Sequence, residues 1–205
     1  MQSRNCVIPM MLLLVLPASA QTTAVELNIY DHAGLSHVVV QSFVKQTLEI
    51  FLKAGLPIRI RICTRVSACE IDGTSAKILM LRIVPGISRQ MNDSSRSPLG
   101  QSFANHTGGT YASVFLEPVQ QQAANHDVPW PTVLAYAAAH EVGHLLLGDQ
   151  AHTSLGLMKA YWNKDDFRDM KQNRMHFNSD EARHLARCCA SSLINAFQPA
   201  KQEEH

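Results

Sequence analysis

The sequence predicts an α/β fold in which short strands and amphipathic helices alternate along one chain. Residues 58–63 (IRIRIC) alternate apolar and polar side chains strictly, which is the pattern of a half-buried strand. Residues 35–53 instead place apolar side chains three or four positions apart from Val40 to Phe51, which predicts an amphipathic helix. Residues 128–148 form a longer apolar run with helical spacing. Together these three patterns favour a domain that contains both strands and helices.

The remaining elements follow from the same signals. Gly55 and Pro57 end the first helix, and Pro85-Gly86 ends a strand. The other predicted elements are strands at 25–30, 77–84 and 111–116, a short helix at 117–124 and a closing amphipathic helix at 179–197. The segments without a clear period are a long polar loop at 88–109, a charged tail at 163–177 that caps the site region, and a frayed end at 198–205.

Residues 1–20 have the features of an export signal. Arg4 provides a positive start, residues 7–16 form an apolar stretch, and Ala18-Ser19-Ala20 matches an A-x-A cleavage site. A membrane anchor is the weaker interpretation, because the apolar stretch has only about half of the roughly 20 residues that a span needs. We therefore expect a secreted or periplasmic protein whose residues 21–205 form a single domain.

The charge balance argues against a nucleic-acid-binding surface. The chain has 18 Lys and Arg against 17 Asp and Glu, and removal of Arg4 leaves 17 against 17. A neutral domain presents no basic surface for nucleic acid. No second apolar segment is long enough to cross a bilayer. We expect no nucleic-acid partner, no membrane contact after signal cleavage, and a monomer.

Four cysteines remain after the signal. An even number in an exported chain suggests disulfides. Cys63 and Cys69 bracket a short polar loop and can close it locally, whereas Cys188 and Cys189 point to different sides of a helix. A Cys-rich zinc site is the alternative, but the chain has no C-x-x-C pair to support it.

The clearest chemical signal lies in residues 140–152, HEVGHLLLGDQAH. One helical turn separates His140 from His144, so both imidazoles leave the same face of the helix and can reach one ion. Glu141 lies beside them and can hold a water at the metal without ligating it. Gly148 ends the helix, and His152 follows as a third nitrogen ligand. Three protein ligands with one open position are typical of a catalytic zinc.

The same residues have other interpretations. His140 and His144 can be core histidines whose nitrogens bond backbone carbonyls, although the third His argues for a metal. A later Glu can be the third zinc ligand, and Glu181 stands at the start of a predicted helix. We interpret the segment Asn178–Glu181 as a helix cap instead. Asp149 and Gln150 follow the helix end too closely to turn onto the metal.

The run from His140 to Trp162 resembles the metzincin clan of zinc endopeptidases, which includes matrix metalloproteases, astacins and archaemetzincins. That clan has H-E-x-x-H-x-x-G-x-x-H followed by a turn that contains Met. The first two histidines and the Glu match, but Gly148 comes one residue late and Gln150 occupies the expected third-ligand position. His152 follows two residues later, and Met158 resembles the turn methionine. The run also resembles small exported bacterial H-E-x-x-H proteins of uncharacterised function.

This resemblance implies an α+β zincin-like fold, with a small mixed twisted sheet, a backing helix, an active-site helix and a C-terminal helix. It implies a zinc-dependent endopeptidase in which Glu141 is the general base and His140, His144 and His152 hold Zn²⁺. Tyr161 is a further candidate for stabilising the oxyanion, as in astacins, but its spacing from Met158 is one residue longer than in that group, and a core tyrosine beside Trp162 is the favoured interpretation. A peptide or protein substrate would lie along an edge strand, either residues 111–116 or the segment before it. The alternative function is a non-catalytic zinc-binding or protein-binding module.

Overall fold

The computed structural model describes residues 25–63, 69, 77–86 and 97–196, with side chains described as far as residue 187. Its centre is a five-stranded sheet with the strand order β2-β1-β3-β5-β4. The four strands β2, β1, β3 and β5 are parallel, and β4 pairs antiparallel with β5 at one edge, so the sheet is mixed as predicted. The strands are β1 (Val25–Asp31), β2 (Ile58–Cys63), β3 (Lys77–Val84), β4 (Gly100–Asn105) and β5 (Gly108–Phe115).

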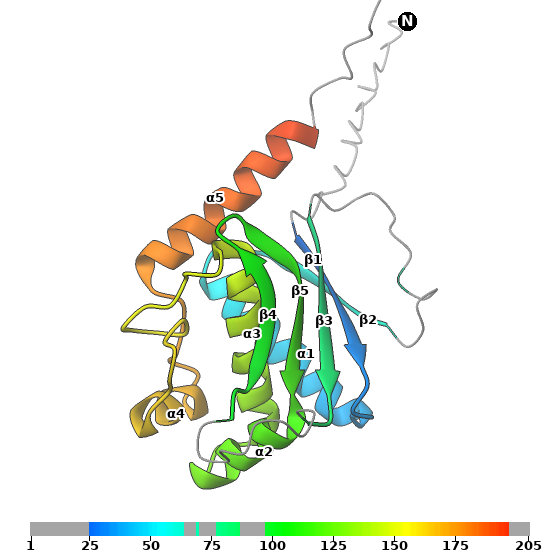
Figure 1. Ribbon diagram of the computed structural model, residues 1–205, viewed down its shortest axis with the longest axis vertical. Coiled ribbons are helices and arrows are strands. Elements are labelled where there is room, and N and C mark those ends of the chain that lie inside the picture. Colours follow the sequence, from blue (N-terminus) through cyan, green and yellow to red (C-terminus); the bar gives the residue numbers. More distant parts are fainter. Residues whose placement is uncertain (1–24, 64–68, 70–76, 87–96, 197–205) are drawn as a thin grey trace, which may run out of the picture.

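Five helices accompany the sheet (Figure 1). They are α1 (His37–Lys53), α2 (Leu116–Asn125), α3 (Trp130–Leu147), α4 (Lys164–Lys171) and α5 (Ser179–Ala196). The helices α1 and α3 pack against each other, α1 also contacts β2, and α3 contacts β3, β4 and β5. The α1 helix is therefore the predicted backing helix, and α3 lies under the edge of the sheet where β4 is found. None of the helices in the described part of the chain is long and apolar enough to cross a membrane.

The core forms where the inward side chains of the strands meet α1 and α3. Leu27 and Ile29 of β1, Leu79 and Leu81 of β3, and Phe43 of α1 are almost completely buried. Alternate residues of a strand point to the same face, so Leu27 lies with Ile29, and Leu79 with Leu81, on the helix side of the sheet. Burial of such apolar side chains contributes about 1.5–3 kcal/mol each to folding.

The α3 helix is the most buried helix of the described chain. Nearly every residue from Val133 to Leu146 is buried, including the two histidines of the motif. A helix that is apolar on every side is expected in the interior of a domain. Pro131 lies in its first turn, where the missing N–H would have no partner within the helix. The helix begins at Trp130, within the apolar run predicted at 128–148.

The sequence-based expectation of one long loop at 88–109 was wrong. The described part of the predicted loop 88–109 contains β4 and the start of β5, whose Gly, Ser, Gln and Asn residues have low strand propensity but pair across a tight turn. Gly108 lies in this turn at φ +105°, and a Cβ there would lie 2.5 Å from the Leu145 carbonyl oxygen. The hairpin therefore rests directly on the C-terminal end of α3. The charged tail 163–177 contains α4, which begins with an Asn163–Asp166 capping box.

Of the four cysteines that follow the predicted signal, only Cys63 and Cys69 have described side chains. Cys63 and Cys69 form a disulfide, which confirms the predicted local bridge. The side chains of Cys188 and Cys189 lie outside the described residues, as do the predicted export signal 1–20 and the frayed end 198–205.

Candidate metal centre

The first two candidate ligands leave α3 on one face. His140 and His144 are 9% and 6% exposed, and their Nε2 atoms are 3.2 Å apart. This approach follows from the four-residue spacing, because residues i and i+4 of a helix lie one above the other. The helix thus presents two imidazole nitrogens to one point in space.

Backbone carbonyls fix the orientation of both rings. The Nδ1 atom of His140 lies 3.0 Å from the Leu157 carbonyl oxygen, and the Nδ1 atom of His144 lies 3.3 Å from the Gly148 carbonyl oxygen. A carbonyl oxygen only accepts, so each Nδ1 carries the hydrogen and donates it. In a neutral ring this leaves the lone pair on Nε2, which is the tautomer that a metal ligand needs.

The third histidine comes from the turn that follows α3. Gly148 ends the helix at φ +102°, and a Cβ at this position would lie 3.0 Å from the His106 carbonyl oxygen. Both the backbone conformation and the close approach therefore favour glycine. The chain then turns back, and Nε2 of His152 lies 3.1 Å from Nε2 of His144.

The three imidazoles fit a zinc ion. One ligand atom from each of His140, His144 and His152 lies within 4.8 Å of the others, and this cluster combines two buried side chains with one exposed side chain. Tetrahedral zinc with Zn–N bonds of about 2.0–2.1 Å separates its ligand atoms by roughly 3.3 Å. The distances of 3.2 and 3.1 Å between Nε2 atoms are close to this value. Lone pairs that converge in this way repel one another unless a cation lies between them.

Burial keeps the two helical histidines neutral. It lowers the pKa of His140 to about 4, against the opposing effect of the hydrogen bond to Leu157, and the neighbouring His144 and His152 lower it further. Burial also lowers the pKa of His144. Neutral imidazole is the form that binds metals, so the rings do not need to lose a proton at pH 7.

Glu141 lies between the metal ligands and the edge strand. Its side chain is 7% exposed and packs against Gly100, where a Cβ would lie 2.6 Å from the Cγ atom of Glu141. Burial raises the pKa of Glu141 to about 7, and a hydrogen bond from the Ser102 side chain opposes this rise. A carboxyl group with a pKa near 7 can both accept and return a proton at physiological pH.

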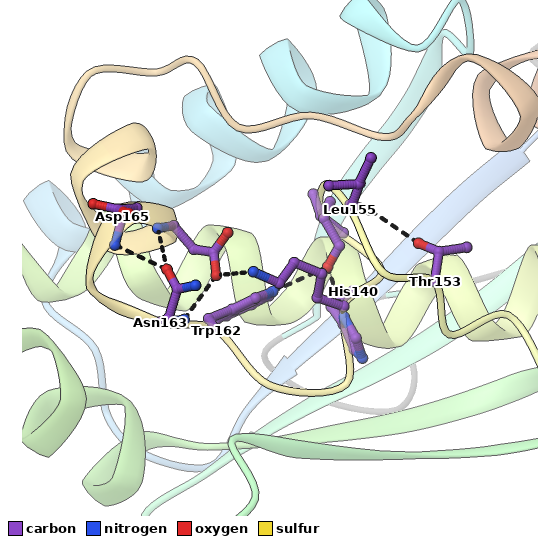
Figure 2. Close-up of polar contacts among 9 residues, drawn as sticks. His140, Thr153, Leu155, Trp162, Asn163 and Asp165 are labelled. Carbon is purple, nitrogen blue, oxygen red and sulfur yellow. Dashed lines mark hydrogen bonds and ion pairs between the residues drawn. The ribbon is translucent and has the colours of Figure 1, made fainter.

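The segment after His152 runs past His140 (Figure 2). The Leu157 carbonyl oxygen accepts hydrogen bonds from His140 and from Nε1 of Trp162, at 3.0 and 3.1 Å. The Trp162 ring meets the His140 ring edge to face, with 5.6 Å between centroids. Met158 is completely buried against Gly143, where a Cβ would lie 2.5 Å from the Met158 sulfur. The absence of a side chain at Gly143 therefore lets this segment approach α3 closely.

A cleft of about 750 Å³ opens beside the ligands. Its walls come from β4, α2, α3 and the segment around Trp162. Two segments were proposed to bind the substrate, residues 111–116 and the segment before them. Residues 111–115 belong to β5, which is internal, whereas the segment before them contains β4, which is the edge strand. Tyr161 lines the cleft but is 79% exposed, so the favoured interpretation as a core tyrosine is wrong. Its role at the oxyanion stays a prediction.

The structure brings together the five site residues proposed from the sequence, which are His140, Glu141, His144, His152 and Tyr161. Their roles as ligands and catalytic groups stay predictions. Gly100 and Ser102 were missed, because their contact with Glu141 depends on the pairing of β4 and no local pattern marks it. The aromatic ring of Phe167, which also lines the cleft, was missed with the α4 helix. The capping box of that helix, Asn163-x-x-Asp166, was the available signal.

Comparison with known proteins gives structural similarity only. No family model matches the chain, and no curated protein sequence matches it. The crystal structure of archaemetzincin from Methanopyrus kandleri is similar with a TM-score of 0.52 and 12% identity, over 83% of this chain and 98% of that chain. The chain has a metzincin-like fold. The zincin-like architecture predicted from the resemblance is therefore confirmed.

Metalloproteinase-II from Bacteroides fragilis is a second similar structure. It has a TM-score of 0.46 and 16% identity, and the match covers 84% of this chain. The match spans only 55% of the length of that protein.

Proposed function

We propose that this chain is a zinc-dependent endopeptidase. The observation that carries the proposal is the convergence of three Nε2 atoms beside a buried carboxyl group whose pKa is about 7. The fold is shared with an archaemetzincin. Peptide hydrolysis is the activity that this donor set supports best.

Each residue of the site has a separate role in the proposed reaction. His140, His144 and His152 would hold the zinc, which when bound supplies the Lewis acidity that activates water and polarises a carbonyl group. Glu141 accepts the proton of the attacking water and returns it to the leaving amine. The buried position of Glu141 favours this role, because a carboxyl group with a pKa near the working pH transfers protons most efficiently. We propose that Tyr161, at the rim of the cleft, stabilises the developing oxyanion.

We propose that the substrate is an extended peptide that pairs with β4. An edge strand offers free backbone N–H and C=O groups, and a peptide can add to it as a further strand. Gly100, Ser102 and Ala104 of β4 line the cleft, so a peptide bound there would run past Glu141. Beyond this stretch, the edge is occupied by the chain itself, since the Asp149 N–H donates to the Asn105 carbonyl oxygen.

A peptide library provides the test. The parent protein is incubated with zinc, with a chelator, and with a chelator followed by excess zinc, and the products are identified by mass spectrometry. The proposal predicts internal cleavage that the chelator abolishes and zinc restores. The Glu141→Gln variant is expected to retain zinc and lose at least about 100-fold in kcat. Glu117→Gln, at an exposed position on α2 outside the cleft, is the matched control and is expected to cleave normally.

The outcomes separate the two candidate functions. Chelator-resistant cleavage, or an active Glu141→Gln variant, would refute the proposed mechanism. Zinc binding without cleavage of any peptide would favour the non-catalytic zinc-binding module. We further propose export of the chain as a monomer, which N-terminal sequencing of the mature protein and light scattering would test; a mature protein that starts at Met1 would contradict export.

A further inference from the structure

A buried carboxylate lies beside the turn that carries the third histidine. Glu181, in the first turn of α5, is only 6% exposed. Among the residues that the structure describes, no basic side chain forms an ion pair with it. A buried carboxylate needs compensating hydrogen bonds, so the partners of Glu181 show what it holds in place.

Part of this bonding is an ordinary helix cap. The Asn178 side chain accepts from the backbone N–H of Glu181 at 3.0 Å, and one carboxylate oxygen of Glu181 accepts from the backbone N–H of Asn178 at 2.8 Å. These two bonds form a capping box. They confirm that Asn178–Glu181 is a cap, as the sequence indicated, but they use only one of the two carboxylate oxygens.

The second oxygen reaches a different part of the chain. It accepts from the Thr153 hydroxyl at 2.8 Å and from the Asn178 side-chain amide at 2.7 Å. The same hydroxyl lies 2.9 Å from the Leu155 carbonyl oxygen, but it has only one hydrogen to donate. The charged carboxylate is the stronger acceptor. This bond therefore ties the start of α5 to the residue that directly follows His152.

His152 lacks the ring support that the other two histidines have. Carbonyl oxygens hold the Nδ1 atoms of His140 and His144, whereas no described residue forms a hydrogen bond with Nδ1 of His152. Its ring is exposed and belongs to a turn outside any helix. The position of the ring therefore depends on the backbone of its neighbour, Thr153.

We propose that Glu181 is a positioning residue for the third zinc ligand and acts through Thr153. The backbone of Thr153 is fixed by its N–H, which donates to the Met158 carbonyl oxygen at 3.0 Å, and its side chain is fixed by Glu181. Two anchors on one residue restrict the turn that presents His152. Groups that orient a ligand typically change metal affinity by about 10–100-fold when they are removed. The inference rests on the proposed zinc site.

Zinc affinity is the measurement that tests it, by competition with a chelator of known affinity. Thr153→Val keeps the shape of the side chain and removes the hydroxyl, and we expect it to weaken zinc binding by about 10-fold or more. Thr153→Ser restores the hydroxyl and is expected to rescue most of the affinity. Glu181→Gln keeps a weaker, neutral acceptor and is expected to give an intermediate loss. Thr153→Val combined with Glu181→Gln should weaken binding no more than Thr153→Val alone, because both act through one bond.

Thr47→Val is the matched control. The Thr47 hydroxyl, like that of Thr153, donates one hydrogen bond, to the Phe43 carbonyl oxygen at 2.8 Å, but Thr47 is buried within α1 whereas Thr153 is exposed. It is expected to lower the thermal midpoint without changing zinc affinity. The d–d absorption of the Co²⁺-loaded protein adds a readout of ligand geometry, and only the variants at positions 153 and 181 should change it.

Each result supports or overturns the inference. Parent-like zinc affinity and Co²⁺ spectrum in Thr153→Val would overturn the role of Glu181 while leaving the zinc site intact. An equal loss of affinity in Thr47→Val would assign the effect to general destabilisation and would also overturn it. Failure of the parent protein to bind zinc would refute the proposed function and this inference together.

Discussion

Gly143 and Met158 are in such close contact that a Cβ on Gly143 would lie 2.5 Å from the Met158 sulfur. Phe177 lies on the same side, 3.1 Å from that Cβ position. Gly143 stands between the two helical histidines, so the absence of a side chain lets the turn around Met158 pack directly beneath them. The backbone at Gly143 is helical, and the requirement for glycine comes from this contact alone.

We predict that Gly143→Ala lowers the free energy of unfolding by about 1–3 kcal/mol, because the added methyl group overpacks a buried site. Met158→Ala alone is expected to cost about 2–5 kcal/mol through the cavity that it leaves. The double variant should be less destabilised than the sum of the two single variants, since each change relieves the other. Denaturant unfolding of the four proteins measures this coupling, and strictly additive effects would contradict the contact.

Gly100→Ala is predicted to disturb the general base while sparing the metal. The new Cβ would meet the Glu141 side chain at 2.6–2.8 Å, so the carboxyl group has to move. We expect kcat to fall by about 10-fold or more, since a small misplacement of a catalytic group is costly, with zinc affinity unchanged. Phe103→Ala, at an exposed position on β4, is the control for general damage to the edge strand. A Gly100→Ala enzyme with parental kcat would show that Glu141 does not act from this position.

The metal-free protein should show two opposing effects of pH on stability. Burial lowers the pKa of His140 to about 4, below its usual 6.5, so the unfolded chain binds more protons and this histidine makes stability rise with pH between these values. Burial raises the pKa of Glu141 from 4.5 to about 7, so the folded chain binds more protons and this carboxyl group makes stability fall with pH over that range. The two contributions oppose each other between about pH 4.5 and 6.5.

Glu141→Gln removes one of these two effects. When the pH is raised from 4.5 to 6.5, we therefore predict that the free energy of unfolding increases more in the metal-free variant than in the metal-free parent. The difference between the two increases is of order 1–3 kcal/mol. The lowered pKa of His144 acts in the same direction as that of His140. Denaturant unfolding in the presence of a chelator at the two pH values provides the measurement. An equal or smaller gain in the variant would contradict the assigned directions.

The elements that the sequence predicted well are those with local periodicity. The strands at 58–63 and 77–84 have the predicted bounds, because two local signals mark them without reference to their partners. Residues 58–63 (IRIRIC) alternate apolar and polar side chains, and residues 77–84 (KILMLRIV) form a short apolar run that Pro85-Gly86 ends. The β4 strand (GQSFAN) was missed, because its stability comes from pairing with β5 and contact with α3, which no local pattern encodes.

The same distinction holds at the metal centre. The four-residue spacing of His140 and His144 within a helix is enough to predict their convergence. The contribution of His152 depends on how the chain turns at Gly148. The hydrogen bond between Thr153 and Glu181 depends on the approach of α5 to that turn. Contacts of this kind join segments far apart in the sequence and require coordinates to be recognised.

Zinc stoichiometry tests the central claim most directly. The protein is stripped with a chelator, reloaded with zinc, desalted and analysed for metal, alongside the variants His140→Ala, His144→Ala and His152→Ala. His37→Ala, at an exposed position at the start of α1, is the matched control. One zinc per chain is expected in the parent and the control, and less than one per chain in each of the three variants after desalting, because each variant lacks one of the three ligands. A parent protein that binds no zinc, or a His152→Ala variant that binds it as tightly as the parent, would contradict a centre built from these three imidazoles.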